Sequence, residues 1–239
     1  PMIVASAAAA VGRPVLILGI EGEADAAIAD YPHRWFGWGQ IGYLLRLLRD
    51  HRTRDLVFVG GVHRRPDYLR MKIDFGTLDD LPTILRIVFS GGDNSVLTGV
   101  VGFFERKGYR IMGAHEVAQE LVAQAGPLTR VRPSAADLRD AELAYRAARA
   151  IGELDIGQAA VAVRGRVVAL EGVEGTDGML ERVGQLHAVG RIRWDGKAGV
   201  LVKCAKPQQD LRVDMPTIGP NTIRSIVATC QSAGVPVRI

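Results

Sequence analysis

The first half of the chain alternates short apolar runs with longer segments of helical periodicity, and this alternation restricts the fold more than any other feature. Residues 14–20 (PVLILGI) and 56–61 (LVFVGG) are aliphatic runs that end at glycine, which predicts two buried strands. Between them, residues 38–51 place leucines at helical spacing with arginines on the other positions. The further predicted elements are helices over 77–91 and 93–108, the second capped by Asp93 and stopped at Gly108, and a strand leading into a short helix over 109–117. This order predicts a parallel, Rossmann-like sheet covered by helices.

The beginning and the middle of the chain indicate how it is divided. Residues 1–12 (PMIVASAAAAVG) form a helix-like run, whereas an α/β domain normally opens with a strand. We therefore expect a strand and its turn to precede Pro1. Residues 125–137 (AGPLTRVRPSAAD) combine prolines and basic residues without periodicity, which predicts a domain boundary. The predicted domains are residues 1–127 and residues 134–239.

The second half of the chain predicts a mixed α+β domain. Its clearest segment is a helix over 134–154, which Ser134 can cap. In the hairpin predicted over 159–175, valines alternate with polar residues around a tight Arg164-Gly165-Arg166 turn. The remaining predicted elements are a helix over 176–186 that Thr176 or Asp177 begins, a strand over 198–206, a helix over 221–234 and a last strand over 235–239.

Composition excludes several classes of protein. Apolar residues make up 48% and charged residues 23% of the chain, which is the balance of a globular protein, and no apolar run reaches the roughly 18 residues of a membrane span. Two cysteines exclude a disulfide framework and favour a reducing cytoplasm. The net charge of +4 suits an anionic ligand or an acidic lipid surface, but it is too small to indicate nucleic-acid binding.

Three segments carry polar groups that could form a site, and each has an ordinary structural alternative. Residues 59–67 (VGGVHRRPD) follow a predicted parallel strand, so Arg64 could pair with a phosphate there or be a solvated loop residue. In residues 154–158 (LDIGQ), Asp155 could bind a ligand or turn the chain. Residues 174–180 (EGTDGML) form a helix start that could bind an anion or be simply well capped.

The segment over residues 206–222 (KPQQDLRVDMPTIGPNT) most strongly favours a functional site. Asp210, Arg212 and Asp214 alternate, so an extended backbone would place them on one face and Asp214 near a cation. Such a carboxylate could hold a divalent metal or orient a water, and Lys203 and Lys206 could neutralise phosphate charge. The alternative is a salt-bridged surface loop. The two lysines beside an apolar strand and the three prolines of the segment favour function.

The order of these segments resembles one enzyme family across almost the whole chain. GAHEV (113–117), LDIGQ, EGTDGML, the lysine-containing strand and RVDMPTIGPNT (212–222) are similar to the UDP-2,3-diacylglucosamine pyrophosphatases of the LpxI type. The resemblance implies hydrolysis of UDP-2,3-diacylglucosamine to UMP and 2,3-diacylglucosamine 1-phosphate (lipid X), a step of lipid A synthesis in Gram-negative bacteria. It also implies Mg²⁺ or another divalent ion such as Mn²⁺, two domains with substrate between them, and attack of water on the β-phosphorus.

The resemblance further implies roles for individual residues. Asp214 corresponds to the family's essential aspartate and is the expected catalytic residue and metal ligand. The expected substrate-binding residues are Lys203, Lys206, Gln158, Thr176, Asp177, Arg64 and Thr217. Relatives have a strand and a glycine-rich turn just before the position of Pro1.

The protein is expected in the cytoplasm, peripherally associated with the inner membrane. Nucleic acid is not an expected partner, and a homo-oligomer is left open. The rival functions are a non-catalytic sugar-nucleotide-binding or sensing protein of the same fold, and a nicotinamide-dependent enzyme. The second would need a glycine fingerprint, and this sequence shows none.

Overall fold

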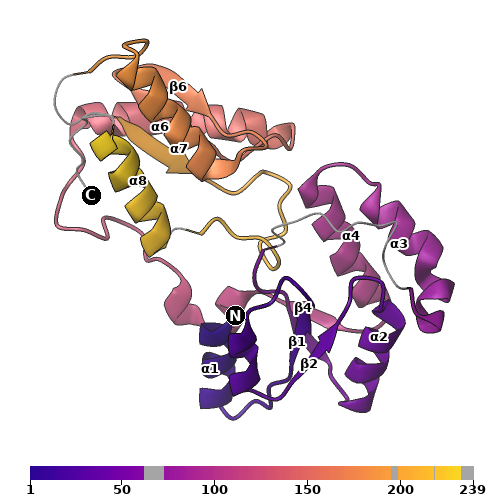
Figure 1. Cartoon of the computed structure of the whole chain (residues 1–239). Coiled ribbons are helices and arrows are strands. Elements are labelled where there is room, and N and C mark those ends of the chain that lie inside the picture. The colour runs from indigo at the N-terminus through magenta and orange to yellow at the C-terminus, as the bar shows by residue number, and fades with distance from the viewer. Residues whose placement is uncertain (62–72, 195–198, 218, 233–239) are drawn as a thin grey trace. The chain divides into compact units, whose positions relative to one another are not determined.

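The computed structural model describes residues 1–61, 73–194, 199–217 and 219–232 (Figure 1). Its contacts divide the chain into an N-terminal unit, Pro1–Ala123 together with Asp210–Val213, and a C-terminal unit, Gln124–Gln209 together with Asp214–Ile239. The sequence-based domain ranges, 1–127 and 134–239, stay a prediction. Both the predicted last strand at 235–239 and Arg64 lie outside the described residues.

Within its described residues, the N-terminal unit contains two pairs of parallel strands. Strand β1 (Ile17–Ile20) pairs with β2 (His33–Phe36), and β3 (Asp55–Val57) pairs with β4 (Arg110–Met112). The pairing confirms a mixed α/β unit with parallel strands, whereas a single Rossmann-like sheet stays a prediction. The helices are α1 (Met2–Ala10), α2 (Ile41–Asp50), α3 (Leu81–Val88), α4 (Asp93–Arg106) and α5 (Ala114–Val117), with 3₁₀ turns η1 (Ala26–Asp30), η2 (Phe75–Asp80) and η3 (Gln119–Leu121).

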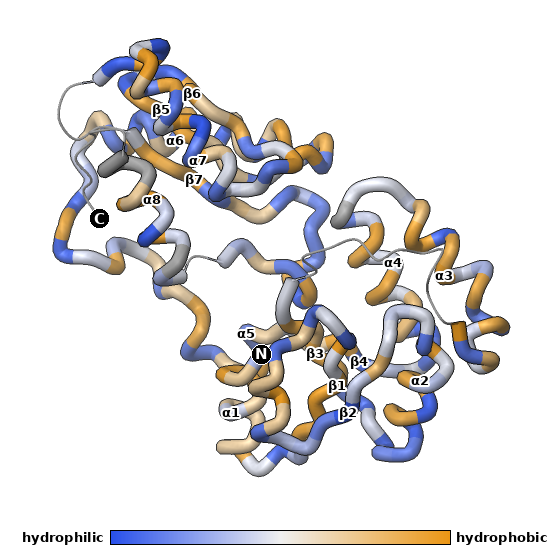
Figure 2. Tube along the Cα trace, in the orientation of Figure 1, coloured by the Kyte–Doolittle hydropathy of each residue, from blue (hydrophilic) through white to orange (hydrophobic). Residues whose placement is uncertain are grey.

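The core of the N-terminal unit is formed by the apolar faces of α2 and α4 against the strands (Figure 2). Leu44 and Leu48, one helical turn apart, are buried with Phe104 of α4, whose ring meets that of Phe103 edge to face. As predicted, α4 ends just before Gly108, which adopts a left-handed φ of 90°. The predicted cap is wrong, because the helix begins at Asp93 itself and the N-cap is the preceding glycine.

Asp74 joins the start of α2 to the start of η2. Its Oδ2 accepts a hydrogen bond from the backbone N–H of Tyr43 at 2.7 Å, and its Oδ1 accepts from the N–H of Thr77 at 2.8 Å. Burial raises the pKa of Asp74, but hydrogen bonds from Thr77, Tyr43 and Gly42 outweigh that effect and lower the pKa below its ordinary value of 3.8. The ionised carboxylate therefore stabilises the fold.

We expect Asp74→Asn to reduce the free energy of unfolding by about 1–2 kcal/mol at pH 7, because the amide cannot accept both sets of hydrogen bonds. Since the pKa of Asp74 is lower folded than unfolded, its contribution is complete above about pH 4 and is lost as pH falls through the folded pKa. Urea unfolding at pH 7 and pH 3 should thus show a smaller difference between wild type and variant at pH 3. An equal difference at both pH values would contradict this, and exposed Asp79→Asn is the control.

In the described part of the C-terminal unit, an antiparallel sheet of three strands lies between two helices. The strands lie in the order β6 (Arg166–Leu170), β5 (Ala159–Val163), β7 (Val200–Lys203). Helix α6 (Ala135–Glu153) packs on the face that carries Ala160 and Ala162, and α7 (Gly175–Ala188) packs on the opposite face. The last described helix, α8 (Pro220–Ser232), packs beside α7 (Figure 1).

The elements of the C-terminal unit confirm most of the predicted ones. Ser134 caps α6 by accepting a hydrogen bond from the N–H of Asp137, and the hairpin turns at Arg164 and Gly165. Two details are wrong. Strand β5 is buried along its whole length because it is the central strand, so its residues do not alternate between core and solvent. Helix α7 begins at Gly175 with Glu174 as its N-cap, rather than at Thr176 or Asp177.

The tight turn between β5 and β6 is held by a buried acid. Arg164 and Gly165 have φ values of 48° and 78°, the left-handed pair typical of a two-residue hairpin turn. Asp140 of α6 is only 5% exposed, and its two carboxylate oxygens accept the N–H groups of Arg164 and Gly165 at 2.7 and 2.6 Å. The turn is therefore fixed against the helix below it.

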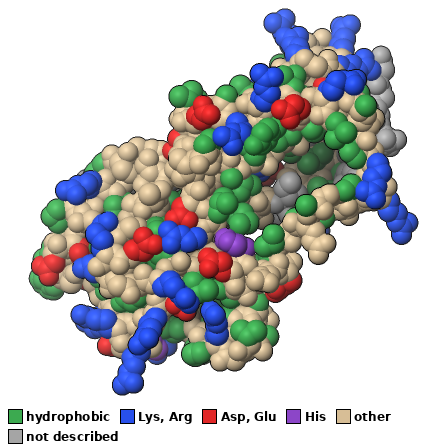
Figure 3. Space-filling model, turned by 180° about the vertical axis from the view of Figure 1, so that it is seen from behind, with side chains coloured by type: hydrophobic (Ala, Val, Ile, Leu, Met, Phe, Trp, Pro, Cys, Tyr) green, Lys and Arg blue, Asp and Glu red, His purple; other side chains and the backbone are tan. Residues whose placement is uncertain are grey.

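The surface is mixed in charge. On the face drawn in Figure 3, Lys and Arg side chains stand in several separate groups with acidic and apolar side chains among them. The net charge of +4 is therefore not gathered into one patch on that face. Within the described part of the chain, no helix has both the length and the apolar character needed to cross a membrane.

Candidate functional site

A polar network in the C-terminal unit is centred on Glu171, the residue that follows β6. Its side chain is 7% exposed. The Thr176 hydroxyl donates a hydrogen bond to Oε1 at 2.7 Å, and the backbone N–H of Gln158 donates to Oε2 at 2.8 Å. Lys203 Nζ in turn donates to Thr176 Oγ1 at 3.2 Å. Three of the predicted substrate-binding residues, Gln158, Thr176 and Lys203, thus come together around one buried carboxylate.

The register of the sheet explains why these residues meet. Ala159, at the start of β5, is paired with Lys203 at the end of β7. The N–H of Glu171 donates to the carbonyl oxygen of Ala159 at 2.9 Å on the other side, which extends the β5–β6 ladder by one bond. Residues before β5, after β6 and at the end of β7 therefore share one end of the sheet. Helix α7 begins there as well and brings Thr176.

Gln158 offers an unused acceptor at this end of the sheet. Its side-chain oxygen Oε1 is buried and finds no hydrogen-bond partner among the described residues. Its backbone is fixed, since the N–H is held by Glu171 and the carbonyl oxygen accepts from the N–H of Cys204 at 2.9 Å. Because buried polar atoms are normally paired, this oxygen is suited to a ligand or a water that donates a hydrogen bond.

A second network carries Asp214. Lys206 Nζ forms an ion pair with Asp155, and the two side chains are 12% and 18% exposed. The backbone N–H of Lys206 donates to Gln209 Oε1 at 2.7 Å. The Gln209 amide then donates to the backbone oxygen of Asp214 at 2.9 Å and also to its carboxylate oxygen Oδ2. Gln209 therefore connects the predicted catalytic carboxylate to the predicted phosphate-binding lysine.

The segment that follows β7 is fixed to the end of α6. Asp155, just past the helix, adopts a left-handed φ of 55°, and its carboxylate is paired with Lys206. The Gln208 amide donates to the carbonyl oxygen of Gly152 at 3.0 Å, and a Cβ at Gly152 would lie 3.4 Å from Pro207. This segment is thus packed on a helix rather than free in solvent.

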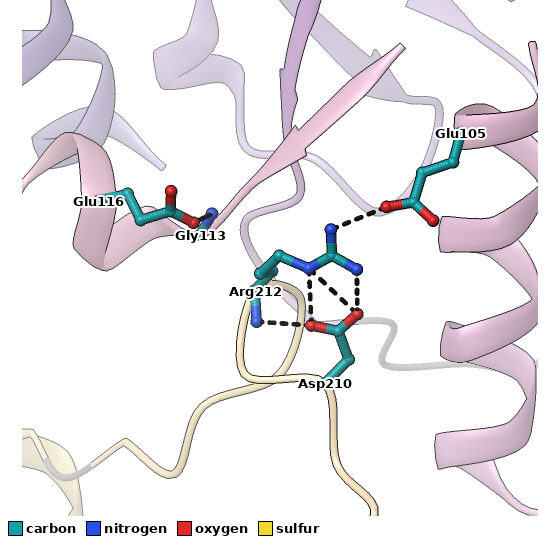
Figure 4. Close-up of polar contacts among 5 residues, drawn as sticks. All are labelled: Glu105, Gly113, Glu116, Asp210 and Arg212. Carbon is teal, nitrogen blue, oxygen red and sulfur yellow. Dashed lines mark hydrogen bonds and ion pairs between the residues drawn. The ribbon is translucent and has the colours of Figure 1, made fainter. Parts of the chain in front are cut away.

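The extended backbone predicted for the segment with Asp210, Arg212 and Asp214 is wrong, because residues 210–213 form a turn. Figure 4 shows the Arg212 side chain turned back onto Asp210. The N–H of Val213 donates to the carbonyl oxygen of Asp210 at 3.1 Å, which closes a turn, and the N–H of Arg212 donates to Asp210 Oδ1 at 3.0 Å. Arg212 Nε and Nη2 also bind the Asp210 carboxylate, while Nη1 donates to Glu105 of α4 at 2.8 Å. Local side-chain bonds to the backbone favour this turn over a strand.

Asp210 and Asp214 therefore have different hydrogen-bond partners. The Arg212 side chain lowers the pKa of Asp210, and its hydrogen bonds with Asp210 and Glu105 raise the pKa of the guanidinium. Residues 210–213 group with the N-terminal unit, where Val213 packs against the core. Asp210 and Arg212 therefore hold this turn in place, and the hydrogen bonds to Asp214 come from Gln209 instead.

Two of the remaining predicted site residues, Asp177 and Thr217, are described and form no part of the two networks. Asp177 is exposed in the first turn of α7, and the Thr217 hydroxyl donates to the carbonyl oxygen of Met215 at 2.9 Å. Arg64 lies outside the described residues. Among those that are described, no group of three or more His, Cys, Asp and Glu side chains is placed to hold a metal ion.

Two residues of the networks are absent from the predicted set. Glu171 belongs to the polar positions of the predicted hairpin, and only the burial of that end of the sheet distinguishes it from a solvated acid. Gln209 is uncharged, and it lies in a segment that was selected for its charged residues. The available signal was the Gln-Gln pair between Pro207 and Asp210, in a segment already selected as functional.

Comparison with known proteins gives matches along the whole chain. The model of the LpxI N-terminal domain matches residues 1–121, and that of the LpxI C-terminal domain matches residues 124–237. A curated relative, the UDP-2,3-diacylglucosamine pyrophosphatase LpxI of Caulobacter vibrioides, is 39% identical over 223 residues. That alignment covers 93% of this chain and 79% of the relative.

Proposed function

The chain belongs to the LpxI family, and from this membership we infer that it is a UDP-2,3-diacylglucosamine pyrophosphatase. The observation that carries the assignment is the 39% identity over 93% of the chain to a relative of that name. The site supports it, since two lysines, a buried amide oxygen and a carboxylate lie within two hydrogen-bond networks of one unit. Cationic side chains and oriented hydrogen-bond partners are what a pyrophosphate substrate requires.

We propose that water attacks the β-phosphorus of the substrate. A bond forms between the water oxygen and that phosphorus, the bond to the bridging oxygen breaks, and the bridging oxygen leaves with UMP. The other product is 2,3-diacylglucosamine 1-phosphate. Asp214 orients the attacking water or a metal ion, and Lys203 and Lys206 neutralise phosphate charge as it shifts to the leaving group. Gln158 and Thr176 hold the substrate; Asp177, Thr217 and Arg64 are proposed as further contacts.

The Asp214 carboxylate is suited to bind a divalent cation together with the phosphates of the substrate. Mg²⁺ is commonly held by one or two carboxylates together with substrate phosphates, rather than by a cage of protein ligands. One carboxylate oriented by Gln209, without a described cluster of three ligands, agrees with that mode. Bound Mg²⁺ or Mn²⁺ would supply charge neutralisation at the pyrophosphate.

The setting of the enzyme follows from its substrate. A lipid with two acyl chains resides in a bilayer, so we propose that the protein is cytoplasmic and associates peripherally with the inner membrane. We also propose that the protein binds the product lipid X. Whether it forms a homo-oligomer is left open. We also propose that the N-terminal unit is Rossmann-like, since its strands pair in parallel and helices connect them.

We expect the purified full-length protein to release UMP from UDP-2,3-diacylglucosamine with Mg²⁺ present, and to incorporate ¹⁸O from labelled water into 2,3-diacylglucosamine 1-phosphate. Liquid chromatography with mass spectrometry measures both products. Chelation of the cation should stop the reaction, because the pyrophosphate would then repel the attacking oxygen. A folded sample that binds the substrate without releasing UMP would indicate the non-catalytic binding function. Label in UMP would move the attack to the α-phosphorus.

A further inference from the structure

Glu171 is a buried acid whose two oxygens are each bound by a residue of the proposed substrate-binding set. We propose that Glu171 is a positioning residue, which orients Lys203 toward the substrate phosphates through the hydroxyl of Thr176. The proposal rests on the proposed function, because it assigns Glu171 to the same reaction. It differs from that function in concerning a residue that need not touch the substrate.

The direction of the Thr176 hydroxyl is the key step. A hydroxyl has one hydrogen to donate and lone pairs to accept with. At 2.7 Å, the carboxylate oxygen Oε1 of Glu171 takes the hydrogen, so a lone pair of Thr176 Oγ1 is left for Lys203 Nζ at 3.2 Å. Without an acceptor at Glu171, the hydroxyl could turn its hydrogen toward the ammonium group, which has only donors. Glu171 therefore makes Thr176 an acceptor for Lys203.

This contact leaves the lysine able to bind phosphate. An ammonium group has three N–H donors, and the bond to Thr176 uses one of them. Lysine side chains lose substantial rotamer entropy when they are held in one place, so a fixed acceptor lowers the entropy loss on substrate binding.

The second oxygen of Glu171 connects the same residue to Gln158. Oε2 accepts the backbone N–H of Gln158 at 2.8 Å, and the side-chain oxygen of that glutamine is the buried atom without a described partner. One carboxylate thus positions a cationic donor at the end of β7 and an acceptor just before β5. A carboxylate that only capped α7 would not account for its bond to the residue before β5.

We expect Glu171→Gln to lower kcat/KM for UMP release by roughly 10- to 100-fold, because an amide offers one acceptor where the carboxylate offers two. The diagnostic readout is the coupling with Lys203→Met. If Glu171 acts through Lys203, the double variant should be about as active as Lys203→Met alone. A structural role predicts instead that the two losses multiply, as does an independent role in catalysis.

A second pair of variants keeps the test decisive should Glu171→Gln fail to fold. Thr176→Val removes the hydroxyl at nearly constant volume, and it should lose activity to a similar extent as Glu171→Gln. Thr176→Ser retains the hydroxyl and should return kcat/KM to within about threefold of wild type. The control is Glu181→Gln, the same change at an exposed position of α7, which should leave activity unchanged.

The outcomes separate the two proposals. A wild-type protein that releases no UMP overturns the proposed function and, with it, the role given to Lys203. An active wild type whose folded Glu171→Gln variant keeps activity within twofold overturns the role of Glu171 alone. So does multiplication of the losses in the double variant, or a Thr176→Val variant as active as Thr176→Ser.

Discussion

Asp214→Ala is expected to reduce UMP release on the order of 1,000-fold or more while the protein stays folded. Removing the carboxylate takes away the group proposed to orient the water or the metal ion, and losses of this size are typical of a lost transition-state contact. The fold should persist, because the hydrogen bonds to this side chain come from Gln209 alone among the described residues. Initial rates with UDP-2,3-diacylglucosamine and Mg²⁺ test the rate, and circular dichroism tests the fold.

Two further variants test whether the loss of activity comes from the charge of Asp214. Asp214→Asn keeps the shape of the side chain and an acceptor for Gln209 but removes the charge, so it should be nearly as inactive as the alanine variant. Asp50→Ala changes an exposed aspartate at the end of α2 and should retain activity within about twofold. A folded Asp214→Ala variant with a tenth or more of wild-type activity would remove Asp214 from the catalytic role.

Asp140→Ala is expected to lower the free energy of unfolding by about 3 kcal/mol or more. The substitution leaves the N–H groups of Arg164 and Gly165 without their acceptor beneath a turn whose residues are both in the left-handed region. Hydrogen bonds to a charged group are worth about 1.5–3 kcal/mol each, and an unpaired buried donor adds a desolvation cost. For a chain of this size, the melting temperature should fall by roughly 6–12 °C.

Chemical denaturation of the C-terminal unit in the full-length protein measures this effect. Glu142→Ala alters an exposed acid on the same helix and should change the free energy of unfolding by no more than about 0.5 kcal/mol. Asp140→Asn should lie between wild type and Asp140→Ala, because it retains one acceptor oxygen. Equal stability of Asp140→Ala and Glu142→Ala would mean that the two hydrogen bonds contribute nothing to the folded state.

Periodicity in the sequence predicted the elements whose burial pattern is simple. The amphipathic helices α2 and α6 and the apolar strands β1 and β7 lie within the predicted segments, since each presents one apolar face or is enclosed. Strand β2 (HRWF) was not predicted, because His33 and Arg34 interrupt its apolar pattern. Its pairing with β1 gives it the extended form, which is a tertiary effect that local sequence does not record.

The candidate site was predictable where polar residues interrupt apolar elements. Gln158, Thr176 and Lys203 stand at such places, and the structure brings them together. Their common partner, Glu171, could not be selected in the same way, since its burial depends on the pairing of β5 with β6 and on the start of α7. The backbone at residues 210–213 was predicted wrongly for a different reason. The alternation of charged and apolar residues imitates a strand, whereas Asp210 bonds to its own neighbour.

The buried centre of the contact between α6 and the sheet consists of alanine. Ala144 and Ala148 of the helix meet Ala160 and Ala162 of β5, and all four are at most 1% exposed. With side chains this small, the two backbones lie too close for a larger residue to enter without displacing the helix. Sequence drift in the C-terminal unit should therefore be slow on this face. A laboratory library that aims to alter the enzyme without unfolding it should leave these four positions fixed.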